Sequence, residues 1–135
     1  MLFFLLACGS TRLPTATLTV DGHAVTVEVA ATGPHRSRGL MYRDAMGDDA
    51  GMLFIYEGEA VRRFWMKDTR IPLSIAFANR SGEIVRIADM KPFDEASTSS
   101  LSPAMYALEM NQGWFEAHGV ERGDKITDLP AITAE

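Results

Sequence analysis

Short runs in which apolar and polar residues alternate recur from about residue 17 to residue 127, and turn-forming residues separate them. Successive side chains of a β-strand point to opposite faces of a sheet, so each run predicts a strand with one buried face. Between residues 25 and 31, for example, every second residue is apolar: Val25, Val27, Val29 and Ala31. The pattern predicts a mainly β fold, a compact antiparallel β-sandwich or barrel-like domain with one or two short helices.

Local chemistry predicts the order of the individual elements. Asp21 and Gly22 form a hairpin signal. Residues 52–56 are apolar at every position, which is typical of a central strand buried on both faces. The sequence Glu57-Gly58-Glu59 then predicts a turn, and residues 61–68 predict a further strand. We expect short helices at residues 35–38 and 114–118, and a polar surface loop at residues 93–103.

The first eight residues are apolar and end at Cys8, the single cysteine of the chain. This run is too short to span a bilayer and is typical of the end of a secretory signal. Residues 5–8 resemble a bacterial lipobox, in which the cysteine is acylated. The alternative is a frayed apolar tail with a buried cysteine. Several acyl chains on Cys8 would anchor an exported chain stably in the cell envelope or periplasm.

The lipoprotein pattern also predicts which membrane holds the anchor and how the chain is divided. Gly9, rather than aspartate, follows Cys8, so retention at the inner membrane is not signalled and the outer membrane is favoured. Residues 1–8 are then a signal-peptide remnant, residues 9–16 a tether, and residues 17–130 a single β-rich domain. The total of 135 residues agrees with one domain.

Composition narrows the classes of function. The formal net charge of −5 argues against a general nucleic-acid binder. The three histidines, His23, His35 and His118, lack the spacing of a zinc site, and the eight methionines show no clustering typical of a copper site. Neither a phosphate-binding loop, nor a dinucleotide fingerprint, nor a nucleophile elbow is present. We therefore expect no metal and no cofactor, and the sequence contains no recognisable catalytic constellation.

The densest group of candidate binding residues lies in residues 62–70. If this segment is extended, Phe64 points to the core and Arg63, Trp65 and Lys67 point to the other side. An indole between two cations suits a flat, sugar-like ligand that carries an anionic group. The alternative is a tryptophan held by cation–π packing that only stabilises the sheet.

Two carboxylates are candidate catalytic groups. Asp68 precedes Thr69 and Pro72, which favours a local turn, although it could instead be an acid at the rim of a pocket. Glu109 lies in the middle of a predicted strand, where a structural ion pair with Arg38 or Arg43 is the commoner arrangement. A general acid or base with a perturbed pKa is the alternative, but no second catalytic partner is evident.

Six short motifs, in order, resemble domain-of-unknown-function family 192, and the resemblance extends from about residue 25 to residue 126. The motifs are residues 38–41, 51–54, 64–69, 71–73, 108–109 and 123–124. The resemblance implies a compact, mainly β, sandwich-like fold with small helices, and no established activity. The motif positions that it carries over are Arg38, Gly39, Met41, Trp65, Met66, Lys67, Thr69, Pro72 and Glu109.

Two positions depart from the family pattern. This chain has Asp68 where the family usually has asparagine, and Ser74 where the family usually has aspartate. The absence of an acid at position 74 weakens any hypothesis of a carboxylate pair or a carboxylate metal site.

Three hypotheses of function follow. The preferred one is a lipid-anchored envelope domain that binds a small or glycan-like, anionic ligand near Trp65. The alternatives are a cell-wall-directed hydrolase or lyase that uses Glu109 or Asp68 as acid or base, and a protein-interaction module of the envelope. The predicted ligand-binding residues are Arg38, Met41, Arg63, Trp65, Lys67, Thr69 and Glu109.

Overall fold

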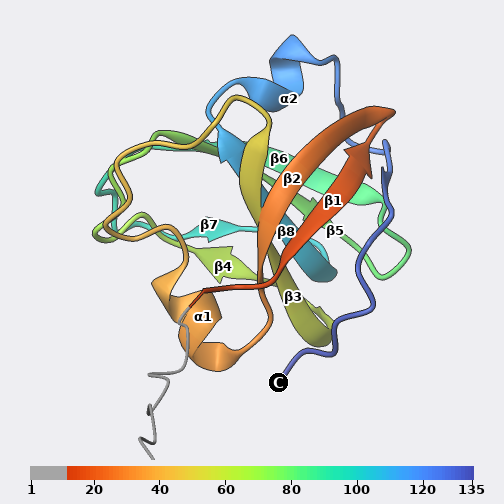
Figure 1. Cartoon of the computed structure of the whole chain (residues 1–135), viewed down its shortest axis with the longest axis horizontal. Helices are drawn as coiled ribbons and strands as arrows, with labels where there is room; N and C mark the ends of the chain where they lie inside the picture. The colour runs from red at the N-terminus through yellow and green to blue at the C-terminus, as the bar shows by residue number, and fades with distance from the viewer. Residues whose placement is uncertain (1–11) are drawn as a thin grey trace, which may run out of the picture.

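The computed structural model describes residues 12–135, and its main element is one curled seven-stranded sheet (Figure 1). The strand order is β6-β5-β8-β3-β2-β1-β9. This architecture confirms the prediction of a compact, mainly β fold. Cys8 and the predicted signal remnant lie outside the described residues. The strands of the sheet are β1 (Thr15–Val20), β2 (His23–Ala30), β3 (Ala50–Ala60), β5 (Leu73–Ala78), β6 (Ile84–Met90), β8 (Ala104–Asn111) and β9 (Ile126–Thr127).

Neighbouring strands of the sheet are antiparallel except for β2 and β3, which are parallel. The prediction of antiparallel pairing thus holds for every pair but this one. Parallel neighbours require a crossover connection, and here the crossover contains helix α1 (Gly33–Arg38) and residues 39–49. The predicted hairpin at Asp21 and Gly22 is present and joins β1 to β2 with φ angles of 45° and 83°.

Two hydrophobic cores lie on the two faces of the sheet. We call them the α1 face and the α2 face. Leu53 and Ile55 belong to the α2 face, together with Trp114 of helix α2 (Trp114–Ala117). Met52 and Phe54 belong to the α1 face. Strand β3 is therefore buried on both sides, as the apolar run of residues 52–56 predicts. No helix within residues 12–135 is long and apolar enough to cross a membrane.

Two local predictions are wrong. The sequence Glu57-Gly58-Glu59 does not form a turn, because β3 continues to Ala60 with an irregular register against β8. Exposed glutamates suit the protruding end of a long strand as well as a turn, so local composition did not separate the two. The predicted strand over residues 61–68 is limited to β4 (Arg63–Phe64), which pairs with β7 (Thr98–Ser99) inside the predicted loop.

The ends of the predicted elements also shift by a few residues. Helix α1 begins at Gly33 rather than residue 35, because the Thr32 hydroxyl accepts a hydrogen bond from the His35 N–H at 3.3 Å and caps the helix. Thr15 and Ala16 belong to β1 rather than to the predicted tether.

Candidate functional site

Four of the six family-like motifs, residues 38–41, 51–54, 64–69 and 108–109, contribute to the lining of a cavity of about 370 Å³ on the α1 face. Helix α1 and the residues that follow it form one wall, and β4 with Trp65 and Thr69 forms the opposite wall. Strands β3 and β8 contribute the floor. The lining residues are Gly33, Arg36, Ser37, Arg38, Gly39, Leu40, Met41, Phe54, Tyr56, Arg63, Phe64, Trp65, Thr69 and Glu109.

The two walls are joined by hydrogen bonds between Tyr42 and Asp68. The Tyr42 N–H donates to the Asp68 carbonyl at 2.9 Å, and the Tyr42 hydroxyl donates to Asp68 Oδ2 at 3.1 Å. Asp68 lies in a turn, with φ of 52°, and the Thr69 hydroxyl donates to the Lys67 carbonyl at 3.0 Å. Asp68 therefore holds the two walls together through Tyr42 but does not itself line the cavity.

Gly39 allows the chain to pass tightly over the floor of the cavity. Its φ and ψ of 49° and −130° are accessible to glycine but strained for other residues. A Cβ atom at this position would lie 3.4 Å from the Phe54 ring. The end of α1 can therefore approach the sheet closely enough to form the wall.

Glu109 is the buried carboxylate of the cavity. Its neighbours across the sheet are Met52 on β3 and Ile75 on β5, both fully buried in the α1-face core. Only 5% of Glu109 is exposed. Within residues 12–135, no hydrogen bond or ion pair to its carboxyl group is present. Burial raises the pKa of Glu109 to about 8, so the carboxyl group is largely protonated at neutral pH.

The predicted ion pair of Glu109 with Arg38 or Arg43 is wrong. Arg43 instead forms two hydrogen bonds with Glu28, at 2.6 and 3.1 Å. Glu28 lies opposite Met52 on β2, two strands from Glu109. Adjacent strands are separated by about 4.8 Å, so the backbones at Glu28 and Glu109 are on the order of 10 Å apart. Arg43 pairs with Glu28, the carboxylate nearer the β2 side of the sheet.

The arginines around the cavity divide into two groups. Arg36 is structural, because its guanidinium donates to the carbonyls of Ala31, Ile55 and Glu135 at 2.8, 3.0 and 2.9 Å. Arg38 and Arg63 are exposed, and neither guanidinium makes an ion pair or hydrogen bond with the part of the chain that the structure describes. Arg38 lies 5.6 Å from the centre of the Tyr42 ring. These two guanidinium groups can therefore meet an anionic group at the mouth of the cavity.

The structure brings together most of the predicted ligand-binding residues. Those that line the cavity are Arg38, Met41, Arg63, Trp65, Thr69 and Glu109. Lys67 does not line it, and its Nζ instead lies 5.3 Å from the centre of the Trp65 ring. Trp65 is 49% exposed, so one part of the indole is available to a ligand while Lys67 covers another.

Sequence analysis missed the aromatic part of the lining. Phe54, Tyr56 and Phe64 line the cavity beside Glu109. Phe64 contacts Phe54 edge to face, with 4.9 Å between ring centres. Tyr56 lies between the guanidinium groups of Arg36 and Arg62, at 4.9 and 3.9 Å from its ring centre. Their apolar runs signal a buried strand, and nothing in those runs distinguishes a core side chain from one that lines a cavity.

Position 74 points away from this cavity. Ser74 lies opposite Met110, whereas its neighbour Ile75 lies opposite Glu109. Alternate side chains on a strand point to opposite faces, so Ser74 is on the α2 face and Glu109 is on the α1 face. An acid at position 74 could not form a carboxylate pair with Glu109. No group of three or more histidine, cysteine, aspartate or glutamate side chains within residues 12–135 is placed to hold a metal ion.

Comparison with known proteins agrees with the motif pattern. Residues 16–127 match the model of domain-of-unknown-function family 192, which is described as an uncharacterised ancient conserved region. A crystal structure from Sinorhizobium meliloti 1021, provisionally named a transcription regulator, has a TM-score of 0.84 and 35% identity, and the match covers 87% of this chain and 96% of that one. A protein of unknown function from Novosphingobium aromaticivorans DSM 12444 has a TM-score of 0.83 and 32% identity, with 87% and 88% covered. Among curated proteins, none matches this chain.

Proposed function

The chain belongs to domain-of-unknown-function family 192, and for this member we propose that the α1-face cavity binds a small, glycan-like ligand that carries an anionic group. The observation that carries the proposal is the carboxyl group of Glu109, which lines the cavity, is only 5% exposed and has no hydrogen bond or ion pair with residues 12–135. Withdrawing a carboxyl group from most of its water is costly, which the raised pKa of Glu109 reflects. A ligand hydroxyl or amine that hydrogen-bonds to Glu109 would remove that cost.

The remaining lining residues support the other parts of such a ligand. Arg38 and Arg63 supply cations at the mouth of the cavity, where a carboxylate or phosphate of the ligand would bind. Trp65, with half of its surface exposed, offers a flat apolar face for a sugar ring. The cavity volume of about 370 Å³ lies within the range of small-molecule sites.

Binding can be tested by thermal unfolding of the full chain. The probes are glucuronic acid and N-acetylmuramic acid, with N-acetylglucosamine as the neutral comparison. A ligand at about a hundred times its Kd stabilises a fold by roughly 2.7 kcal/mol, which raises Tm by several degrees. We expect a shift with the anionic sugars that Trp65→Ala and Glu109→Gln each abolish.

Arg80→Ala serves as the matched control for these variants, because Arg80 is exposed and pairs with Glu59 away from the cavity. This variant should retain the full ligand-induced shift. If the ligand raises the Tm of Trp65→Ala as much as that of the parent protein, the α1-face cavity is not the binding site. Unfolding of Trp65→Ala without any ligand would show that the indole has a structural role instead.

A second candidate function is acid–base catalysis on cell-wall material. The raised pKa of Glu109, about 8, suits a general acid at neutral pH. The second carboxylate of such a site, Asp68, is not among the lining residues, so binding is the better-supported function. Release of reducing sugar from purified wall material, lost in Glu109→Gln, would favour catalysis.

The third hypothesis, a protein-interaction module, has weaker support. Trp65 is exposed, but it forms part of a concave wall rather than a flat apolar patch. If every sugar probe fails while Trp65→Ala folds normally, a protein partner becomes the favoured ligand.

We also propose that the domain acts in the cell envelope, held by acyl chains on Cys8. The support is the lipobox-like sequence of residues 5–8. Metabolic labelling with an alkyne-tagged palmitate, followed by membrane fractionation, tests this assignment. The label and the membrane association should both be lost in Cys8→Ser, and retention of either would contradict the lipid anchor.

A further inference from the structure

Strand β6 forms one edge of the sheet and is paired on its outer side at only one end. There, the Ile84 N–H donates to the Asp124 carbonyl at 2.8 Å, and the Gly123 N–H donates to the Ile84 carbonyl at 2.8 Å. An isolated bridge joins Glu83 to Lys125. Beyond Ile84, within the described part of the chain, the backbone of residues 85–90 makes no hydrogen bond other than those to β5.

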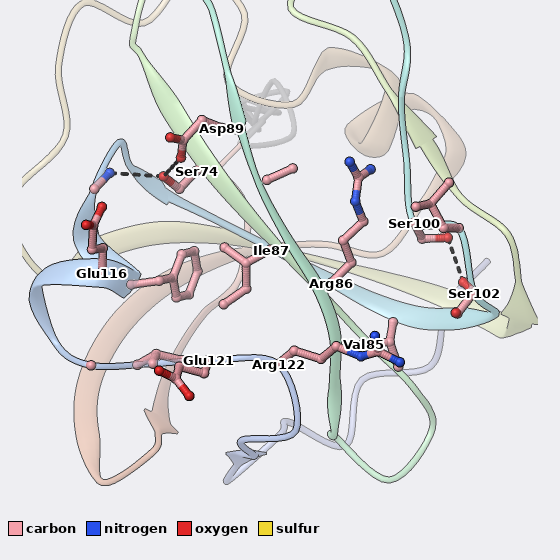
Figure 2. Close-up of a pocket in the computed structure, with 16 residues that line it drawn as sticks. Ser74, Val85, Arg86, Ile87, Asp89, Ser100, Ser102, Glu116, Glu121 and Arg122 are labelled. Carbon is pink, nitrogen blue, oxygen red and sulfur yellow. Dashed lines mark hydrogen bonds between the residues drawn. The ribbon is translucent and has the colours of Figure 1, made fainter.

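A cavity of about 700 Å³ runs along this unpaired edge (Figure 2). Five consecutive β6 residues, 85–89, all line it. The side chains of the regularly paired residues 86–89 point alternately to the two faces, so a cavity that all four line must follow the edge of the strand. Residues 119–122 form the opposite wall, where the chain diverges from β6 before it pairs with Ile84. The cavity is thus a gap in a sheet that is joined at one end and open at the other.

The outer edge of β6 is only partly protected against pairing. Natural sheets shield edge strands with proline, charged side chains, β-bulges, very short strands or a covering loop. The register of β6 against β5 is irregular at Val85, next to the joined end, whereas residues 86–90 pair regularly with β5. Strand β9, at the other edge of the same sheet, is only two residues long. Strand β6 has seven residues and contains neither proline nor lysine, and five of its residues are not fully buried. Its open backbone groups can therefore accept an additional strand.

The charges around the cavity differ between its two sides. Asp89, Glu116 and Glu121 line it on the side of α2, as Figure 2 shows for the part next to Ser74. Arg122, which follows Glu121, also lines the cavity, near Val85. The Ser74 hydroxyl donates to Asp89 Oδ1 at 2.6 Å and accepts the Gly113 N–H at 3.0 Å, which fixes the Asp89 carboxylate in place. Arg86 lies on the opposite face of β6 and donates to the Ser99 carbonyl.

We propose that an extended peptide binds in this cavity as an eighth strand paired with β6, with a lysine or arginine side chain directed toward Asp89, Glu116 and Glu121. Main-chain hydrogen bonds supply affinity in this mode of recognition, and alternate side chains supply specificity. Three carboxylates, against Arg122 at the other end of the wall, favour a basic residue of the peptide beside Asp89, Glu116 and Glu121.

A second copy of this chain fits the edge less well. In a two-fold symmetric pair of antiparallel β6 strands, residues that face each other come from the same face of the sheet. Arg86 and Asp89 are three residues apart and therefore lie on opposite faces. Their charges could not neutralise each other across such a dimer.

Fluorescence anisotropy of a labelled eight-residue peptide of alternating lysine and valine, titrated with the full chain, tests this proposal. A glutamate–valine peptide tests the charge preference. Two peptides that are N-methylated at either the lysines or the valines test the backbone pairing. We expect the lysine peptide to bind about ten-fold more tightly than the glutamate peptide, and at least one N-methylated peptide to lose about ten-fold in affinity.

Variants of the acidic wall complete the experiment. Glu116→Gln/Glu121→Gln should weaken the lysine peptide about ten-fold, whereas Glu57→Gln/Glu95→Gln removes two exposed charges elsewhere and should leave its affinity unchanged. Equal binding of the lysine and glutamate peptides, or full affinity of both N-methylated peptides, would overturn the proposal. So would a dimer in sedimentation analysis that Ile87→Lys disperses, because a second copy would then occupy the edge. Glu109→Gln does not touch this cavity, so the test is independent of the α1-face site.

Discussion

Glu109 on β8 lies directly opposite Met52 on β3, so an acidic side chain and a fully buried thioether share the same face of the sheet. Met52 in turn separates Glu109 from Glu28, which is neutralised by Arg43. The outer carboxylate therefore has a salt bridge, whereas the inner one has none within residues 12–135 and lines the cavity. The burial of Glu109 in this row explains its raised pKa.

The ionisation of Glu109 should make stability depend on pH. Its pKa is about 8 in the folded chain and ordinary in the unfolded chain, so the folded state binds the extra proton between these values. The free energy of unfolding should therefore fall as pH rises from about 5 to about 8, by up to about 5 kcal/mol. Urea unfolding of the full chain at pH 5, 7 and 9 measures this change.

Glu109→Gln should remove this part of the pH dependence, because glutamine is neutral at every pH and of similar size. Glu116→Gln, which removes an exposed acid, is the matched control and should follow the parent protein. If Glu109→Gln loses stability between pH 5 and pH 9 as steeply as the parent protein, the assigned pKa of Glu109 is wrong.

Gly51→Ala should be strongly destabilising. A Cβ atom at position 51 would lie 2.3 Å from the Glu109 carbonyl oxygen and 2.5 Å from Met110 Sδ, so β3 and β8 would have to separate beneath the cavity. We expect a loss of about 3 kcal/mol or more in the free energy of unfolding, measured by chemical denaturation. Gly58→Ala on the same strand meets nothing within 4 Å and should be neutral or slightly stabilising. Equal effects of the two substitutions would contradict the close approach at Gly51.

The ion pair between Arg43 and Glu28 should contribute modestly to stability. The pair is bidentate, and the two side chains remain 40% and 30% exposed. Exposed pairs are worth about 0.2–1 kcal/mol, so a double-mutant cycle with Glu28→Gln and Arg43→Met should give a coupling energy in that range. In the same variants, the pKa of Glu109 followed by carbon-detected NMR should not change. A fall or rise of that pKa in Arg43→Met would indicate that Arg43 acts on Glu109 after all.

Local pattern in the sequence was sufficient for much of the fold. The alternation of residues 25–31 and the continuous apolar run of residues 52–56 identified one half-buried and one fully buried strand, because side-chain period reports burial directly. The hairpin at Asp21 and Gly22 followed from the left-handed backbone that these residues tolerate. The predictions for residues 57–59 and 61–68 were wrong because charged residues and glycine occur in turns, exposed strand ends and irregular segments alike.

By itself, the sequence determined the family, the mainly β class and six of the residues that line the α1-face cavity, because short motifs and periodicity are local properties of the chain. Tertiary structure alone decided which carboxylate has a salt bridge. Glu28 and Glu109 are 81 positions apart in sequence, yet only one strand, β3 with Met52, lies between them in the sheet. The segment that follows α1 brings Arg43 within hydrogen-bond distance of Glu28. The open edge of β6 was equally invisible in the sequence. The outer edge of β6 is paired only where residues 123–124 approach Ile84, and the path of residues 119–124 is a property of the tertiary structure.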